Sequence, residues 1–166
     1  MSLKQLRFQV SNGLLPSARM WHRVMQTRLG HHGLSSACIL PFIFIGRSDG
    51  GLHQVMLAQQ LGMEGPSLVR LLDKLAAAGL VRREADASDR RANKLWLTEA
   101  GQELHAQIEQ GLTALREEVL AEMSEKELRA VLKLYRLIDE AAAVDVAAGT
   151  LSGEDVSPVG PGVQPR

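Results

Sequence analysis

Residues 64–98, EGPSLVRLLDKLAAAGLVRREADASDRRANKLWLT, decide the fold that the sequence predicts. Leucines recur at helical spacing from Leu68 to Leu75, which predicts a helix with one buried face. Pro66 suits the first turn of that helix, because proline has a fixed φ and no N–H to donate. Gly79 stands where a left-handed cap is expected to end the helix. The stretch therefore begins with a short amphipathic helix.

Two short extended segments follow this helix. Residues 80–83 are apolar and then basic, and residues 94–97 alternate at period two, which predicts a hairpin. The polar turn between the two segments contains two acids and two arginines, namely Asp86, Asp89, Arg90 and Arg91. An amphipathic helix followed by a two-stranded hairpin with a basic tip predicts a winged helix-turn-helix that reads duplex DNA.

One side of the predicted helix carries no acid and is expected to face DNA. A recognition helix points its N-terminal residues toward base edges in the major groove, and an adjacent hairpin can place an arginine in the minor groove. The residues expected to contact DNA are Pro66, Ser67, Arg70, Lys74, Arg90 and Arg91. Asp86 and Asp89 are expected to orient the wing without touching DNA. The alternative is that both wing arginines are solvated and paired with these acids.

The residues before this stretch predict three further helices. The apolar spacing before Pro16 leaves open a short helix or a loose arm over residues 1–15, since Ser11-Asn12-Gly13 interrupts it. Pro16 is expected to begin the first main helix, which stops by Gly30. A second helix is apolar nearly all round, so it should be buried; Ser35 or Ser36 can cap it. Residues 52–61 read as the first helix of the helix-turn-helix motif.

Two long amphipathic helices are expected after the wing, over residues 98–122 and 124–145. Thr98 can cap the first, and Ser124-x-x-Glu127 is a capping box for the second. Their apolar stripes have little of their own domain to cover, so we expect them to form a C2 homodimer; folding back on one subunit is the alternative.

The expected organisation is a domain over residues 16–147, followed by a flexible tail over 148–166 that is rich in Gly, Pro and Ser. Within the domain the winged helix-turn-helix occupies about 34–97. The dimerisation helices occupy about 16–30 and 98–145, which makes the expected fold class mainly α.

Charge is unevenly distributed along a chain whose net charge is zero. Residues 1–48 hold six Lys or Arg and no acid, residues 65–97 hold seven against four, and residues 98–166 hold six against thirteen. A basic half that faces DNA and an acidic half in solvent would produce this distribution. No apolar run is long enough to span a membrane. The single cysteine and the absence of a recognisable signal peptide favour the cytoplasm.

No motif in the chain points to catalysis. There is no nucleophile elbow, no phosphate-binding loop and no framed pair of carboxylates, so we do not expect an enzyme or a cofactor. The five histidines and Cys38 show no strong ligand spacing, so we expect no metal site. Cys38 lies among apolar residues, which favours a buried thiol over a redox sensor.

The run from Gly62 to Gly101 resembles the DNA-binding core of the MarR/SlyA family of bacterial regulators. The patterns PSLVR-x-LD-x-L and D-x-S-D-R-R carry this resemblance most specifically, and a weaker likeness extends from about Leu15 to Ala143. The resemblance implies a dimer that binds a palindromic operator, usually represses transcription, and often releases DNA on binding an aromatic acid or on oxidation. By resemblance, Ser67 and Arg70 contact bases and Arg91 enters the minor groove.

The resemblance also implies an effector pocket between the first helices and the dimer helices. The candidate lining residues are Trp21, His22, Met25, Cys38 and Phe42. By residue type alone these side chains are ordinary core, which is the competing interpretation. The function expected overall is a ligand-responsive, sequence-specific repressor. The competing class is a winged-helix module that uses the same helix face to hold a protein.

Overall fold

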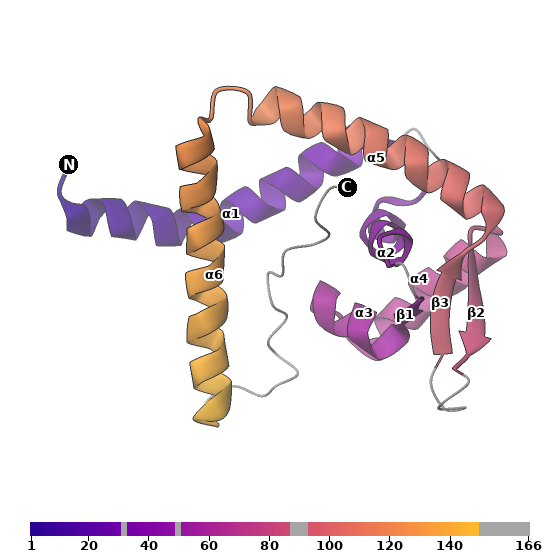
Figure 1. Ribbon diagram of the computed structural model, residues 1–166. Coiled ribbons are helices and arrows are strands. Elements are labelled where there is room, and N and C mark those ends of the chain that lie inside the picture. The colour runs from indigo at the N-terminus through magenta and orange to yellow at the C-terminus, as the bar shows by residue number, and fades with distance from the viewer. Residues whose placement is uncertain (31–32, 49–50, 87–92, 150–166) are drawn as a thin grey trace.

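The computed structural model of the chain describes residues 1–30, 33–48, 51–86 and 93–149. Its helices are α1 (Leu3–Leu29), α2 (Ser36–Gly46), α3 (Gln54–Leu61), α4 (Gly65–Ala77), α5 (Glu99–Val119) and α6 (Glu125–Ala147). Its strands are β1 (Leu52–His53), β2 (Val81–Ala85) and β3 (Asn93–Leu97). The helices α2 to α4 gather beside the small sheet, whereas α1 and α6 reach away from it (Figure 1). The mainly helical winged helix-turn-helix is confirmed.

α1 is longer than the sequence indicated. It runs through the Ser11-Asn12-Gly13 segment without a break and holds Pro16 in its interior, so the expected start at Pro16 was wrong. The helix begins instead at a capping box, in which the Ser2 hydroxyl accepts from the Gln5 N–H and the Gln5 side chain accepts from the Ser2 N–H at 2.8 Å. This cap secures the first turn, and the proline removes only one internal hydrogen bond downstream.

α2 forms the centre of the fold, as its uniformly apolar sequence predicted. Its buried residues are Cys38, Ile39, Pro41, Phe42, Ile43 and Ile45. Ser35 stands at the N-cap position, but its hydroxyl donates to the Cys38 Sγ at 3.2 Å and makes no cap hydrogen bond to the backbone. Burial of the apolar side chains, rather than capping, therefore accounts for the placement of this helix.

The sheet has three strands in the order β1-β3-β2, not the two expected. Leu52 and His53, which were expected to begin a helix, pair antiparallel with Leu95 and Lys94. A two-residue strand is too short to show alternation, and its hydrogen bonds depend on the open edge of β3. Only the tertiary structure supplies that edge, so β1 could not be recognised from the sequence.

The end of α4 and the start of α5 are joined through one threonine. Gly79 adopts φ +70°, and the Leu80 N–H donates to the Leu75 carbonyl at 3.0 Å, which closes the helix in a Schellman motif. The Thr98 hydroxyl donates to the Gly79 carbonyl at 2.6 Å and accepts from the Gly101 N–H at 3.0 Å. Thr98 thus caps α5, as predicted, and attaches it to the end of α4.

α6 has the predicted capping box at Ser124 and Glu127. Hydrogen bonds from the Ser124 side chain and backbone lower the pKa of the Glu127 carboxyl. The helix itself contributes no buried residue. Large apolar side chains on α1 and α6 remain exposed, including Leu3, Phe8, Leu15, Leu132, Leu137 and Val144. These two helices therefore present apolar faces that their own subunit leaves uncovered.

A cluster of charged side chains joins the end of α2 to α5. The Arg47 Nε donates to the Glu109 Oε1 at 2.7 Å, and the Arg116 Nη2 lies 3.6 Å from the Glu109 Oε2. Burial alone would raise the pKa of Glu109, but the hydrogen bond and charge of Arg47, together with Arg116 and His105, outweigh it and lower the pKa. Glu109 is therefore held as a carboxylate between the two helices.

His105 is packed into the same joint. A Cβ on Gly46 would overlap the His105 ring, so no larger residue fits at position 46 without moving the imidazole. The His105 Nε2 is buried, has no hydrogen-bond partner among the described residues, and lies 3.7 Å from the Glu109 Oε1. Burial lowers the pKa of His105 from 6.5, and the nearby carboxylate of Glu109 opposes this shift only in part.

We expect the His105→Gln variant to lose part of the acid sensitivity of folding. Below the ordinary pKa of 6.5 the unfolded chain takes up a proton that the folded chain resists, so stability should fall as the pH decreases from 6.5 toward the lowered folded value. Glu109 adds a separate loss of folding stability only below pH 4.5, because its pKa in the folded protein is also lowered. Urea denaturation at a fixed protein concentration, from about pH 8 to about pH 3, measures the loss of stability in both pH ranges.

The matched control is His22→Gln, which replaces a histidine of α1 outside this cluster. Because this variant also loses one histidine but leaves the cluster intact, a flattening of the curve seen only with His105→Gln is assigned to the cluster. A His105→Gln curve that keeps the full decline below pH 6.5 would show that the buried imidazole does not cause it.

Candidate nucleic-acid interface

α4 buries one side and exposes the other, as its leucine spacing predicted. Leu68, Leu72 and Leu75 are at most 1% exposed and belong to the core. The four helix residues expected at the DNA are all on the exposed side, namely Pro66, Ser67, Arg70 and Lys74. The orientation of α4 therefore follows from burial of its leucines, and it directs Ser67, Arg70 and Lys74 into solvent.

The turn between α3 and α4 has the geometry of a helix-turn-helix. Gly62 ends α3 in the left-handed region at φ +58°, and the Met63 N–H donates back to the Ala58 carbonyl at 2.9 Å. Glu64 occupies the N-cap of α4 without a side-chain cap, and Pro66 lies in the first turn. After the N-cap residue Glu64, the first turn of α4 contains no acid, so the side chains of this turn add no negative charge near a bound phosphate.

The basic residues of this face are available for an external partner. In the part of the chain that the structure describes, neither Arg70 nor Lys74 forms an ion pair. α4 contains one acid, Asp73, whose Oδ1 lies 2.8 Å from the Nη2 of Arg83 on β2. The Arg83 Nη2 also donates to the Val69 carbonyl at 3.4 Å. Sequence reasoning missed Arg83, since nothing in the spacing showed that β2 would reach this helix.

The tip of the wing lies outside the described residues. Arg90 and Arg91, expected in the minor groove, and Asp89, expected to orient one of them, fall within residues 87–92. Asp86 is described, and only 6% of it is exposed. Its Oδ2 lies 3.2 Å from the His53 Nε2 and 3.1 Å from the Lys94 Nζ. Asp86 therefore joins β1 to β3 at the base of the wing.

The opposite face of the sheet carries an aromatic residue. The Arg82 guanidinium lies 5.7 Å from the centroid of the Trp96 ring and also pairs with Glu84. Gly51, at φ +76°, lies against the indole, where a Cβ would be 2.6 Å from the ring. Arg82 is therefore engaged within the sheet and differs from Arg83, which points to α4.

The candidate effector residues lie in or near the core of the described structure. Met25, Cys38 and Phe42 are buried core residues, and Trp21 packs against the same core. The Gln26 Nε2 lies 3.2 Å from the His22 Nδ1. The burial of these side chains agrees with the core interpretation, in which Cys38 is an inaccessible thiol.

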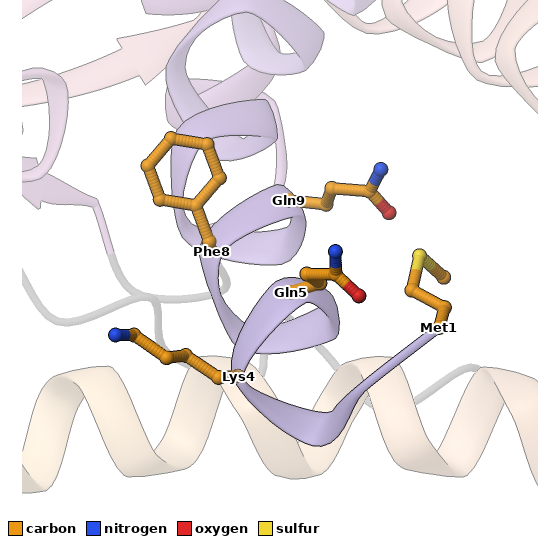
Figure 2. A pocket seen from close by; sticks show the side chains of 5 residues that line it. All are labelled: Met1, Lys4, Gln5, Phe8 and Gln9. Atoms are coloured by element: carbon orange, nitrogen blue, oxygen red, sulfur yellow. The ribbon is translucent and has the colours of Figure 1, made fainter.

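Two surface hollows of the described residues lie elsewhere, and none of the five candidate residues lines them. One, of about 640 Å³, lies along the first turns of α1 and is lined by Met1, Lys4, Gln5, Phe8 and Gln9. Figure 2 shows Met1, Gln5 and Gln9 on one side of this helix and Lys4 and Phe8 on the other. Another, of about 350 Å³, lies between the end of α2, the sheet and α5.

Metal-ligating clusters and membrane-spanning helices are absent from the described residues. Among residues 1–30, 33–48, 51–86 and 93–149, no group of three or more His, Cys, Asp or Glu side chains is arranged to hold a metal ion. No helix in the same ranges is both long and apolar enough to cross a membrane.

Comparisons with known proteins agree with this geometry. A sequence profile described as MarR family matches residues 32–92. The crystal structure of the transcriptional regulator PA3341 is 37% identical, with 82% of this chain and 98% of that chain covered and a TM-score of 0.73. The crystal structure of MarR is 26% identical over 89% and 95% of the two chains, with a TM-score of 0.65. BldR from Sulfolobus solfataricus is 26% identical over 84% and 99%, with a TM-score of 0.71.

Proposed function

Since the chain belongs to the MarR family of transcriptional regulators, we propose that it is a ligand-responsive repressor that binds a palindromic operator as a homodimer. The observation that carries this proposal is the exposed face of α4. A helix whose leucines hold it against the core presents to solvent Ser67 and two cations, Arg70 and Lys74, that pair with no acid among the described residues. Short polar and basic side chains in such a position suit base edges and phosphates in a major groove.

The competing function is a module that uses the same face of α4 to hold a protein. The centre of a protein interface is usually depleted of charge and enriched in aromatic residues. The exposed face of α4 has the opposite composition, with a cation at Arg70 and another one turn later at Lys74. The charge of this face therefore favours DNA over a protein partner.

We expect Arg70→Ala to weaken binding to the operator by about 1–3 kcal/mol and to relax the preference at one base pair. Arg70 faces away from the core, so the fold should be retained. Competition binding against random duplex DNA, over a series of salt concentrations, measures this effect. The unsubstituted protein should show a steep negative dependence on salt, which marks phosphate neutralisation.

The control is Lys74→Ala, which should weaken binding to operator and random DNA about equally. If Arg70→Ala also weakens binding to operator and random DNA equally, Arg70 contacts only phosphate. If the protein shows no salt-dependent binding to duplex DNA, the competing function, a protein-interaction module, is favoured instead.

The uncovered helices support the homodimer. α6 buries no residue on its own subunit, and apolar side chains on α1 and α6 are exposed together. Exposed apolar faces of this extent are expected to pack against another surface, and a second copy offers the same two helices. Such a dimer would fix the separation of two α4 helices, so half-sites should be centred about one helical turn, or roughly 10 bp, apart.

We expect the protein to sediment as a dimer at about 10 µM and Leu132→Glu to shift it toward the monomer, since the new charge would be buried in the interface. Leu132 is 63% exposed on α6. Val55, 69% exposed on α3, provides the matched control, and Val55→Glu should remain dimeric. An unsubstituted protein that sediments as a monomer would refute the homodimer.

The proposed ligand response is supported by the family to which the chain belongs and by the packing of α1 and α2 against α5. A structure with the same fold at 19% identity, CouR from Rhodococcus jostii RHA1, is bound to p-coumaroyl-CoA. In this chain the candidate residues Trp21, Met25, Cys38 and Phe42 pack in or against the core, and His22 is partly buried beside them on α1. A ligand there would have to separate α1 and α2, which would change the spacing of the two α4 helices.

We expect salicylate to weaken operator binding without dissociating the dimer. A ligand that prefers the DNA-incompetent spacing by about 100-fold shifts the equilibrium by about 2.7 kcal/mol. A gel-shift titration, with sedimentation of the same mixtures, measures both properties. Operator affinity that is unchanged at millimolar salicylate would reject an aromatic acid of this size as the effector.

A further inference from the structure

The one acid of α4 lies beside the residues that the proposed function assigns to DNA. Asp73 is three residues after Arg70 and directly before Lys74, and its side chain is 58% exposed. Residues three apart on a helix are close enough to form an ion pair. A free Asp73 carboxylate would therefore have two unfavourable effects: it would repel phosphates, and it would compete with a base for Arg70.

The structure shows that Asp73 forms an ion pair with a residue from outside the helix. The Arg83 Nη2 lies 2.8 Å from the Asp73 Oδ1 and donates to the Val69 carbonyl at 3.4 Å. Val69 and Asp73 are one turn apart, so the guanidinium spans one turn along the side of α4. Arg83 projects from β2 on the same face of the strand as the buried Val81, which directs it toward this helix.

The pairing of Asp73 leaves the basic face of α4 uncompensated. In the described ranges Asp73 pairs with Arg83, whereas Arg70 and Lys74 have no ion pair. An ion pair between partly exposed side chains adds little to folding stability. Its effect on a polyanion can be larger, because it removes a negative charge from the surface that the polyanion approaches.

We propose that Arg83 is a positioning residue for DNA recognition: by pairing with Asp73 it keeps Arg70 free for a base and attaches the wing strand β2 to the recognition helix. This inference rests on the proposed function, since it concerns how that same face reads DNA. Arg83 itself need not touch DNA. A strand residue that neutralises the acid of the recognition helix makes base readout depend on the wing being folded against that helix.

The test is a double-mutant cycle on Arg83 and Asp73, measured on the highest-affinity duplex selected from a randomised pool by the unsubstituted protein. Arg83→Gln should weaken binding about tenfold and relax the base preference at the position that Arg70→Ala also relaxes. Asp73→Asn should bind as tightly as the unsubstituted protein or more tightly. The double variant R83Q/D73N should return to within about threefold of Asp73→Asn, with the base preference restored.

The controls separate this role from direct contact and from general charge. Arg83→Lys keeps a cation beside Asp73 and should stay within about threefold of the unsubstituted protein. Arg82→Gln removes the neighbouring arginine, which is engaged with Trp96 on the other face of the sheet, and should leave affinity unchanged. Thermal denaturation of every variant checks that the fold is retained.

Three results would overturn the inference. In the first, Arg83→Gln lowers DNA affinity equally in the unsubstituted protein and in the Asp73→Asn background, and the salt dependence indicates about one fewer neutralised phosphate. Arg83 would then contact DNA directly. An Arg82→Gln loss as large as that of Arg83→Gln would mean that only net charge matters. An Arg83→Gln variant that binds DNA as tightly as the unsubstituted protein would mean that an unpaired Asp73 does not weaken DNA binding. Failure of the unsubstituted protein to prefer any selected duplex would instead reject the proposed function.

Discussion

Burial of one side of α4 against the core fixes the orientation of this helix, and the exposed face and the neighbouring contacts follow from that orientation. Leu68, Leu72 and Leu75 are almost completely excluded from solvent, and burying each leucine contributes about 1.5–3 kcal/mol. Rotating α4 about its axis would expose these side chains, so the helix has one stable orientation. Because the helix cannot rotate, the residues on its other side, Arg70 among them, point outward in one direction.

The polar contacts around α4 fix its neighbours rather than the helix itself. Thr98 joins the end of α4 to the start of α5. Asp86 joins β1 to β3 through His53 and Lys94, and Arg83 joins β2 to α4. Each contact is modest in free energy. Together they set the position of the sheet relative to the helix, and a protein that reads two grooves at once would require that relation to be constant.

The parts of the molecule that lie furthest from α4 are its least buried helices. α6 buries nothing on its own subunit, whereas the half of α1 near α5 includes the core residues Met25 and Leu29. Glu109 pairs with Arg47, and the His105 ring packs against Gly46, so α5 is attached to the end of α2 and connects the DNA-facing part to the exposed helices. A change in the packing of α1 and α6 would therefore reach α4 through α5 and α2.

Residue spacing was enough to predict the local features of this protein: the leucine face of α4, the glycine that ends it, and the caps of α5 and α6 at Thr98 and Ser124. These features depend on residues within one or two turns, where spacing is informative. Three features could be seen only in the folded chain: residues 52–53 form a strand, α1 runs through Pro16, and Arg83 reaches Asp73. A strand pairing and an ion pair between distant segments depend on where the chain returns in space, and local spacing carries no information about that return.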